Sequence, residues 1–313
     1  MQMNVDIETI QNKLKQAESS LSSIILGKPR QIRMAISCLL AQGHLLIEDL
    51  PGLGKTTLAL SIAQVFGLDF QRVQFTSDIL PADITGISVF NPQTQSFDFH
   101  SGPIFCQLLL ADEINRAPPK SQSALLEAME EKQVTQDRHK RTLPTPFFVL
   151  ATQNPSEQAG TFPLPESQLD RFLMRIEMGY PDTQAERELL MGEDRRKKIQ
   201  TLTTVISPTE LLHFQQTTSK IHISKSLLDY MLALLQSSRL SPWFACGLSP
   251  RAGLALQKCA QAWALLEGRD FVIPEDVQQI FASVAAHRLI KHSDFFNESI
   301  DELIKKLLQQ VPI

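Results

Sequence analysis

The sequence contains little cysteine, and its cysteines do not form a recognised metal-binding or redox motif. Only four cysteines occur in 313 residues, far apart and in apolar or small-residue surroundings. No Cys-x-x-Cys pair exists, and the histidines do not fall at metal-ligand spacing near the cysteines. These absences argue against a cysteine-ligated metal and favour buried free thiols in a reducing compartment. The four residues are Cys38, Cys106, Cys246 and Cys259.

Long hydrophobic runs are also missing. Residues 1–18 mix charged and polar side chains and lack the apolar segment of a signal peptide. No other apolar run approaches membrane-spanning length. We therefore expect a cytoplasmic protein without an integral membrane segment, either free or held at a membrane by a partner.

An excess of positive charge is absent as well. The chain has 30 Lys+Arg against 34 Asp+Glu, which gives a net charge of −4 and a pI of about 6.0. This balance does not suggest a protein whose whole surface binds nucleic acid or anionic lipid, although it is compatible with a local basic patch.

The length and the order of elements predict two domains. A hydrophobic fraction of 43% in 313 residues is typical of a soluble globular protein with more than one core. Up to residue 181, apolar runs alternate with helical stretches, which predicts an α/β domain with a mainly parallel sheet covered on both faces. The predicted strands cover residues 44–48, 70–76, 107–111, 147–152 and 172–178, and the predicted helices cover 7–21, 31–42, 57–66 and 121–131.

After Pro181 the strand-like runs disappear and helical segments remain. Several of these begin with Pro or a small polar residue, as helix starts commonly do. We therefore predict an α/β domain over residues 1–181 and an all-α domain over residues 182–313. The predicted helices of the second domain cover 183–191, 208–217, 224–238, 251–267, 274–289 and 298–310.

A phosphate-binding loop is predicted between the strand at 44–48 and the helix that follows. Its residues 49–56, Asp-Leu-Pro-Gly-Leu-Gly-Lys-Thr, keep the Gly-Lys-Thr end of the P-loop pattern, whereas Asp49 replaces the first glycine. We expect this change to be tolerated because phosphate contact depends more on residues 52–56. The strand–turn–helix context outweighs the alternative of an ordinary glycine-rich turn beside a lysine.

The loop residues have separate physical tasks. Gly52 and Gly54 allow backbone amides to turn inward, and the following helix directs its positive dipole end at the phosphates. Lys55 can reach the β- and γ-phosphates, and the Thr56 hydroxyl can ligate Mg²⁺. ATP and Mg²⁺ are therefore the expected cofactors. The predicted nucleotide-binding residues of the loop are Asp49, Leu50, Pro51, Gly52, Leu53, Gly54, Lys55, Thr56 and Thr57.

Two carboxylates, Asp112 and Glu113, end an apolar strand. Ligands of open α/β sheets bind at the carboxyl ends of the strands, so Asp112 is expected to hold Mg²⁺ and Glu113 to act as general base for water. Taken alone, a solvated strand end explains both residues equally well. Asn154 ends another buried-type strand and could orient the water or touch the γ-phosphate, although an Asn-Pro turn is a strong alternative.

The order of P-loop, Asp112-Glu113 and Asn154 resembles the AAA+ ATPases. Longer stretches resemble the MoxR family specifically, and the resemblance covers nearly the whole chain. Motifs of this length are highly specific. These stretches are 74–76 with 80–86, 110–120, 122–131, 151–155, 169–172 and 249–252.

The resemblance implies a AAA+ P-loop domain with a five-stranded, mainly parallel sheet sandwiched by helices, followed by an all-α lid domain. Arg171 resembles the arginine finger, which reaches the γ-phosphate in a neighbouring subunit. Arg251 resembles sensor 2, through which the chain's own helical domain would complete the pocket and couple lid position to the γ-phosphate. Without the resemblance, a surface salt bridge is the commoner role for either arginine. Ile25, Leu26 and Gly27 resemble the segment near adenine.

Two stretches resemble inserts that would face a ring pore and act on a substrate. Residues 88–101 are similar to the insert in helix 2, and residues 134–144 to the hairpin before sensor 1. The cluster 137–141 is more basic than expected for this hairpin. A solvated loop is its alternative interpretation, and internal packing is the alternative for Phe97 and Phe99.

These observations predict a MoxR-type AAA+ ATPase that hydrolyses ATP to ADP and phosphate and remodels or activates a partner protein. The resemblance implies a ring, expected to be hexameric, and a von Willebrand A domain partner. It is also compatible with metal insertion or complex maturation. One alternative is a nucleotide-dependent binding switch with little hydrolysis, which the hydrolytic residues disfavour. Another is a DNA-acting motor, which the slightly acidic composition disfavours, so nucleic acid is not an expected partner.

Overall fold

The first part of the chain is built on a five-stranded parallel sheet. The computed structural model describes residues 6–137, 139–155, 160–191 and 195–313. The strand order is β2-β5-β8-β1-β9, and every neighbouring pair is parallel. This confirms the predicted fold class, and each strand lies within two residues of its predicted range. The strands are β1 (Leu45–Glu48), β2 (Phe70–Gln74), β5 (Leu108–Asp112), β8 (Phe148–Gln153) and β9 (Met174–Ile176).

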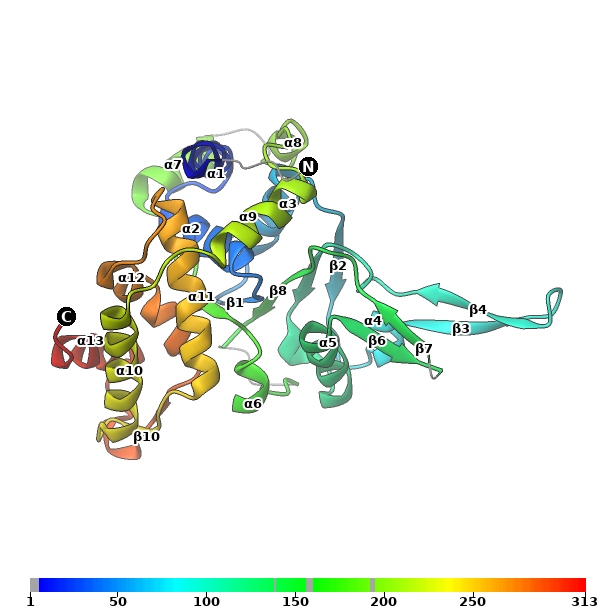
Figure 1. Ribbon diagram of the computed structural model, residues 1–313. Coiled ribbons are helices and arrows are strands. Elements are labelled where there is room, and N and C mark those ends of the chain that lie inside the picture. The colour runs from blue at the N-terminus through cyan, green and yellow to red at the C-terminus, as the bar shows by residue number, and fades with distance from the viewer. Residues whose placement is uncertain (1–5, 138, 156–159, 192–194) are drawn as a thin grey trace.

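Both faces of the three inner strands, β5, β8 and β1, are buried, as their continuous apolar runs predict, whereas the edge strand β2 is largely exposed. Successive side chains of a strand point to opposite faces, so Leu45 and Ile47 enter one apolar cluster and Leu46 enters another. Figure 1 shows helices on both sides of the strands. Helices of the first cluster include α1 (Ile7–Ser22), α2 (Pro29–Leu40) and α3 (Lys55–Val65), and those of the second include α4 (Pro81–Thr85) and α5 (Pro119–Glu131).

Two antiparallel hairpins occupy the predicted inserts. Strand β3 (Gly86–Asn91) pairs with β4 (Ser96–Ser101), and β6 (Gln133–Gln136) pairs with β7 (His139–Thr142). The β3–β4 hairpin projects away from the body, on the side opposite the C-terminal helices (Figure 1).

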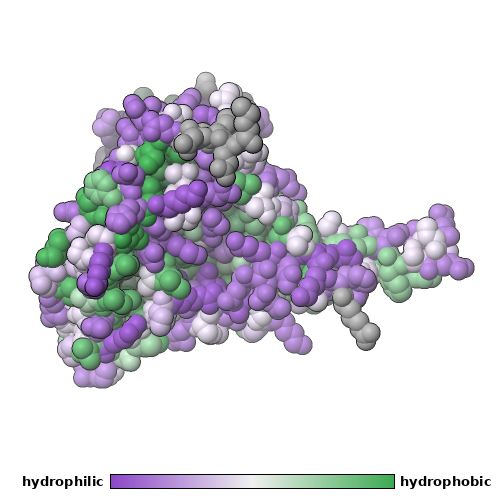
Figure 2. Space-filling view, viewed as in Figure 1, coloured by the Kyte–Doolittle hydropathy of each residue, from purple (hydrophilic) through white to green (hydrophobic). Residues whose placement is uncertain are grey.

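The two hairpins touch through a cation and an aromatic ring. The Arg141 guanidinium lies 3.7 Å from the centre of the Phe99 ring, so Phe99 packs internally. Phe97, in contrast, is 71% exposed, and Phe90 packs against it edge to face. Figure 2 shows apolar surface along the projecting hairpin. Arg138, part of the predicted basic cluster, lies outside the described residues.

The chain after residue 181 is mainly helical, as predicted. Serine side chains cap four of its helices at Ser207, Ser224, Ser249 and Ser299, each accepting a hydrogen bond from a first-turn backbone amide. The sequence did not predict helix α8. The helices are α7 (Thr183–Met191), α8 (Arg195–Gln200), α9 (Pro208–Thr218), α10 (Lys225–Leu240), α11 (Pro250–Leu266), α12 (Pro274–Ala285) and α13 (Ile300–Gln310).

Two short strands also occur in this region, β10 (Phe244–Cys246) and β11 (Ile290–Lys291), and they pair antiparallel. Segments of two or three residues are too short to show an alternating pattern in the sequence. Shorter helices complete the described structure at Ile114–Arg116, Glu166–Leu169 (α6) and Ser293–Phe295.

The first apolar cluster continues from the sheet into the C-terminal helices. It joins Leu39 of α2 to Leu256 of α11 and Phe281 of α12. Helix α12 also packs against the edge strand β9. The two regions therefore share a core, which fixes where α11 and α12 lie relative to the strands.

The cysteine prediction is partly wrong. Cys38, Cys106 and Cys259 are buried free thiols, but Cys246 is exposed, because it lies on the short β10–β11 ribbon rather than in a core. Among the described residues, none of the helices combines the length and the apolar character that crossing a lipid bilayer requires.

Candidate nucleotide-binding site

The P-loop lies between β1 and α3, at the carboxyl end of the parallel sheet. Gly52 and Gly54 have φ values of 85° and 87°, a left-handed conformation that glycine adopts without strain. A Cβ added to either glycine would meet no atom within 4 Å, so space remains beside both. Helix α3 begins at Lys55 and directs its first amides toward this space. The loop therefore fits a bound phosphate group.

Lys55 lies inside this loop. Its Nζ donates to the Asp49 carbonyl oxygen at 2.6 Å. Burial lowers the pKa of Lys55, and the carboxylates of Asp49, Asp112 and Glu113 act in the opposite direction. Thr56 and Thr57 follow in the first turn of α3, and the Thr56 hydroxyl makes no hydrogen bond to any described residue. This leaves its oxygen accessible as a metal ligand.

Asp49 has a structural task that the sequence did not indicate. Its Oδ1 accepts a hydrogen bond from the Leu50 amide at 2.8 Å, and its Oδ2 accepts one from the Gly179 amide at 2.5 Å. The side chain therefore ties the loop to the segment after β9. Among the described residues, Asp49 is not one of those with positive φ, so a glycine is not required there.

Asp112 ends β5 and is 8% exposed. It accepts hydrogen bonds from the Thr152 hydroxyl at 2.6 Å and from Arg72 Nη2 at 2.7 Å. A single carboxylate and a threonine hydroxyl are ligands that suit Mg²⁺, which binds through one or two carboxylates together with phosphate oxygens and water. Among the described residues there is no cluster of three or more His, Cys, Asp or Glu that would form an all-protein metal site.

Glu113 follows Asp112 in a left-handed conformation with φ of 58°. Its carboxylate accepts a hydrogen bond from Gln74 Nε2 at 2.8 Å and lies 2.9 Å from Arg116 Nε. Its backbone amide donates to the Thr152 hydroxyl at 2.9 Å. These contacts hold the carboxylate in place, and a role as base requires that it becomes available to water.

Asn154 is buried just after β8, and its carbonyl oxygen lies 3.4 Å from Asn115 Nδ2. Strand β8 lies between β5 and β1 in the sheet. The carboxyl ends of these strands therefore bring together the P-loop, Asp112, Glu113 and Asn154, as the sequence predicts.

The predicted adenine segment lies close to the start of the helical region. Ile25 is buried, Leu26 is half-buried, and Gly27 has φ of 66°. A Cβ added to Gly27 would lie 2.9 Å from the Ala185 Cβ, so a larger residue would collide with α7. Lys28 Nζ donates to the Tyr180 carbonyl oxygen at 2.6 Å, next to the Gly179 amide that binds Asp49.

Arg171 and Arg251 lie together, but near the amino ends of the strands, whereas the P-loop lies at the carboxyl ends. Arg171 Nε is 3.3 Å from Glu130 Oε2, and Arg251 Nη2 donates to Glu130 Oε1 at 3.0 Å. Leu173, two residues after Arg171, donates a hydrogen bond from its backbone amide to the carbonyl oxygen of His44. His44 directly precedes β1.

The P-loop follows β1 at its opposite end. A four-residue strand spans roughly 13 Å, so the described structure does not bring either arginine to the P-loop of its own chain. The position of Arg251 therefore differs from the expectation that the chain's own helical domain completes the pocket, because α11 holds it near the amino ends of the strands.

Sequence reasoning missed several residues that contact the predicted ones. Arg72 and Gln74 lie two residues apart on β2 and bind Asp112 and Glu113, respectively. The polar residues at alternate positions of this strand were the sequence signal that could have identified them. Arg288 is almost completely buried and binds Asp170 Oδ1 at 2.6 Å, a contact across the two regions that no local pattern indicates.

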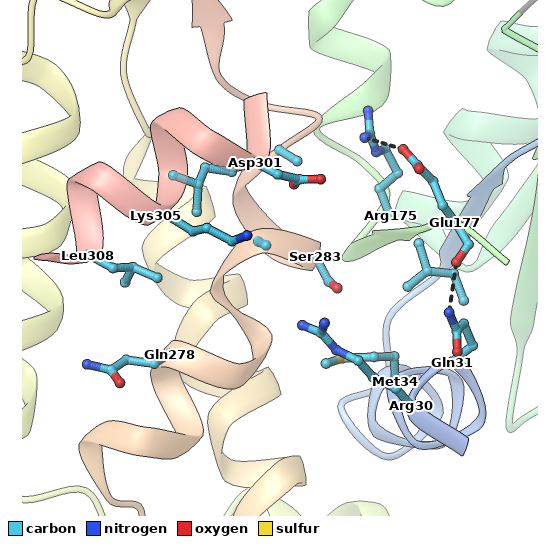
Figure 3. A pocket seen from close by; sticks show the side chains of 14 residues that line it. Arg30, Gln31, Met34, Arg175, Glu177, Gln278, Ser283, Asp301, Lys305 and Leu308 are labelled. Carbon is cyan, nitrogen blue, oxygen red and sulfur yellow. Dashed lines mark hydrogen bonds and ion pairs between the residues drawn. The ribbon is translucent and has the colours of Figure 1, made fainter. Parts of the chain in front are cut away.

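A separate cavity of about 370 Å³ lies between α2, the end of β9, α12 and α13 (Figure 3). Arg175 in its wall is paired with Glu48 and Glu177. No P-loop residue lines this cavity, so it is distinct from the nucleotide site.

Comparisons with known proteins identify the class. Residues 44–174 match the ATPase family associated with various cellular activities (AAA), and residues 236–307 match the AAA lid domain. The chain is thus a AAA+ ATPase-family domain followed by a lid.

Three relatives narrow this class. Chaperone MoxR1 of Mycobacterium tuberculosis is 38% identical, over 96% of this chain and 82% of that protein. Protein MoxR of Paracoccus denitrificans is 31% identical, over 92% and 91%. A crystal structure of a candidate ATPase from Cytophaga hutchinsonii has a TM-score of 0.88 and 34% identity, over 98% and 96%. The chain belongs to the MoxR family of AAA+ ATPases.

Proposed function

We propose that this protein binds ATP with Mg²⁺ and hydrolyses it to ADP and phosphate. The observation that carries the proposal is the gathering of Lys55, Asp112, Glu113 and Asn154 at the carboxyl ends of β1, β5 and β8. Bonds of Asp112 and Glu113 to Thr152 support a fixed geometry. Family membership supports nucleotide binding.

The mechanism assigns one task to each residue. The amides of the loop and the Lys55 ammonium bind the phosphates, and Lys55 exchanges the Asp49 carbonyl oxygen for a phosphate oxygen. Thr56 and Asp112 would hold Mg²⁺, which supplies charge neutralisation of the phosphates when bound. Glu113 accepts the proton of the attacking water, and Asn154 orients that water. Gln74 and Arg116 release Glu113 for this step.

The proposal extends to a homo-oligomeric ring, with a hexamer as the expected size. Its support is the position of Arg171 and Arg251 at the amino end of the strands, away from the P-loop of their own chain. There they can contact a nucleotide held by a neighbouring subunit. A guanidinium at a transferring phosphoryl group contributes roughly 10³–10⁵ in rate in well-studied NTPases.

The energy of hydrolysis is proposed to remodel or activate a partner protein in the cytoplasm, in the manner of a chaperone. The projecting hairpin supports this, since Val89, Phe90 and Phe97 are about half exposed or more. Exposed apolar side chains of this kind mark interaction sites. A von Willebrand A domain protein is the expected partner, and maturation of a complex or metal insertion the expected outcome.

Glu113→Gln tests the hydrolytic assignment. The amide cannot accept the proton of water, so we expect ATP to bind with unchanged affinity while phosphate release falls by about 100-fold or more. Phosphate release and the binding of a fluorescent ATP analogue measure the two effects. Wild-type turnover in the variant would remove Glu113 from the mechanism. Proteins that co-purify with this variant in ATP would identify the partner.

A further inference from the structure

Glu130 lies between the two arginines of the proposed intersubunit site. It is the penultimate residue of α5, and its two carboxylate oxygens are divided between the arginines. Oε2 lies 3.3 Å from Arg171 Nε, and Oε1 accepts a hydrogen bond from Arg251 Nη2 at 3.0 Å. One carboxylate thereby joins an arginine of the α/β region to the first turn of α11.

The surroundings of this carboxylate are strongly cationic. A cavity of about 330 Å³ at this place is lined by Glu130 and Asp170 and by five cationic side chains. Asp170 binds the buried Arg288 at 2.6 Å, and its other carboxylate oxygen lies 4.0 Å from Arg251 Nε. Lys132 and Lys258 form no ion pair with any described residue. Five positive charges against two negative ones favour a polyphosphate over an apolar or cationic occupant. The five cations are Lys132, Arg171, Arg251, Lys258 and Arg288.

We infer that Glu130 is a positioning residue for ATP hydrolysis, holding Arg171 and Arg251 as one unit that faces the phosphates of a neighbouring subunit's nucleotide. The inference rests on the proposed function of these two arginines.

Two guanidinium groups held side by side repel each other, and a carboxylate between them offsets that repulsion. A guanidinium has five N–H donors, so one contact with Glu130 leaves the other donors available for phosphate. Glu130 can therefore orient both arginines without consuming their capacity to bind.

Glu130→Gln tests the role because it removes the charge and keeps the size of the side chain. We expect turnover of the assembled protein to fall by about 10- to 100-fold, the effect of small misplacements in an active site. The affinity of dilute protein for a fluorescent ATP analogue should not change, because Glu130 does not line the P-loop of its own chain. Glu131→Gln is the matched control, since Glu131 is exposed and forms no ion pair with a described residue.

A double-mutant cycle separates positioning from a general structural effect. If Glu130 acts through the two arginines, Glu130→Gln should cost less turnover in an Arg171→Ala background than in the wild type, because only the contact with Arg251 remains to be lost. The same fold-loss in both backgrounds would overturn the inference, and so would wild-type turnover of Glu130→Gln.

Urea unfolding shows whether the fold is kept. If Glu130→Gln unfolds more easily, Glu130→Asp takes its place, and its turnover should lie between those of the wild type and of Arg171→Ala. Wild-type turnover in Glu130→Asp and Glu130→Gln alike would overturn the inference.

A different result would reject the proposed role of the two arginines. That role is wrong if Arg171→Ala and Arg251→Ala themselves keep full assembly-dependent turnover. If those two variants lose turnover while Glu130→Gln keeps it, only the positioning role is wrong.

Discussion

Asp49 shows how a single side chain changes the way in which a phosphate-binding loop is held. Most P-loops begin with glycine, but here the carboxylate binds the Leu50 and Gly179 amides. The backbone carbonyl oxygen of Asp49 also accepts a hydrogen bond from the Lys55 ammonium. The residue therefore serves as a fixed anchor for the loop, whereas Gly52 and Gly54 supply the conformational freedom.

Replacing Asp49 by glycine, which restores the usual first residue, should destabilise the protein. The loss of two hydrogen bonds to a carboxylate and the added backbone entropy predict a decrease of about 3 kcal/mol or more in the free energy of unfolding. Urea unfolding measures this. Asp49→Asn keeps one acceptor and should lose less. Equal stability of the wild type and Asp49→Gly would show that the Gly179 contact contributes nothing.

Lys55→Ala should abolish most nucleotide binding, because it removes the one ammonium inside the loop. A charged hydrogen bond contributes about 1.5–3 kcal/mol, which corresponds to roughly a 10- to 150-fold loss of affinity. Titration with a fluorescent ATP analogue measures the loss, and the exposed Lys15→Ala on α1 is the control. Unchanged ATP affinity would contradict the assignment of the loop.

At the scale of elements, His44 joins three of them at the amino end of the sheet. It directly precedes β1, and its Nδ1 accepts a hydrogen bond from the Val149 amide at the start of β8. Its Nε2 lies 3.3 Å from the carbonyl oxygen of Met129 in α5. Burial lowers the pKa of His44 to about 4. The imidazole is therefore held neutral where Glu130 and Arg171 emerge.

This lowered pKa predicts a loss of stability in acid. Because the folded pKa is about 4 and an unfolded histidine has one near 6.5, the unfolded state binds more protons as pH falls. The contribution of His44 is fully present above about pH 6.5 and is lost progressively down to about pH 4.

His44→Asn removes the titrating group and keeps an acceptor for the Val149 amide. The difference in unfolding free energy between the wild type and this variant should narrow from pH 7 to pH 4.5. His100→Asn on the exposed strand β4 is the control substitution. A pH-independent difference for His44→Asn would rule out titration of His44.

On the scale of the whole molecule, two sets of functional residues lie at opposite edges of one sheet. The P-loop, Asp112, Glu113 and Asn154 are at the carboxyl ends of the strands, and the arginine pair with Glu130 is near the amino ends of β1 and β9. A head-to-tail arrangement of subunits would bring one edge against the other, and such contacts form closed rings when the rotation closes.

Arg171→Ala and Arg251→Ala should therefore keep nucleotide affinity and lose assembly-dependent turnover, by roughly 10³-fold for the arginine finger. Specific activity measured over a dilution series checks this, because wild-type activity should fall as subunits separate. The exposed Arg187→Ala on α7 should behave as the wild type. A wild-type specific activity that is independent of concentration would contradict a site completed by a neighbour.

The sequence by itself determined the strands, the P-loop and the carboxylates at the end of β5. These features depend on local rules: a buried strand is apolar throughout, a left-handed turn favours glycine, and ligands meet the carboxyl ends of parallel strands. Residues 44–57 and 108–113 therefore contain the information for their own conformation. The long motifs of the family then added roles for Arg171 and Arg251.

Only the tertiary structure decided which of these residues meet. Arg72 and Gln74 reach Asp112 and Glu113 because β2 pairs with β5 in the sheet. Glu130, Arg171 and Arg251 meet because α11 packs on a core shared with the sheet, and Asp49 reaches Gly179 across 130 residues of sequence. Contacts between distant segments depend on how helices and strands pack, and no local sequence pattern records that packing.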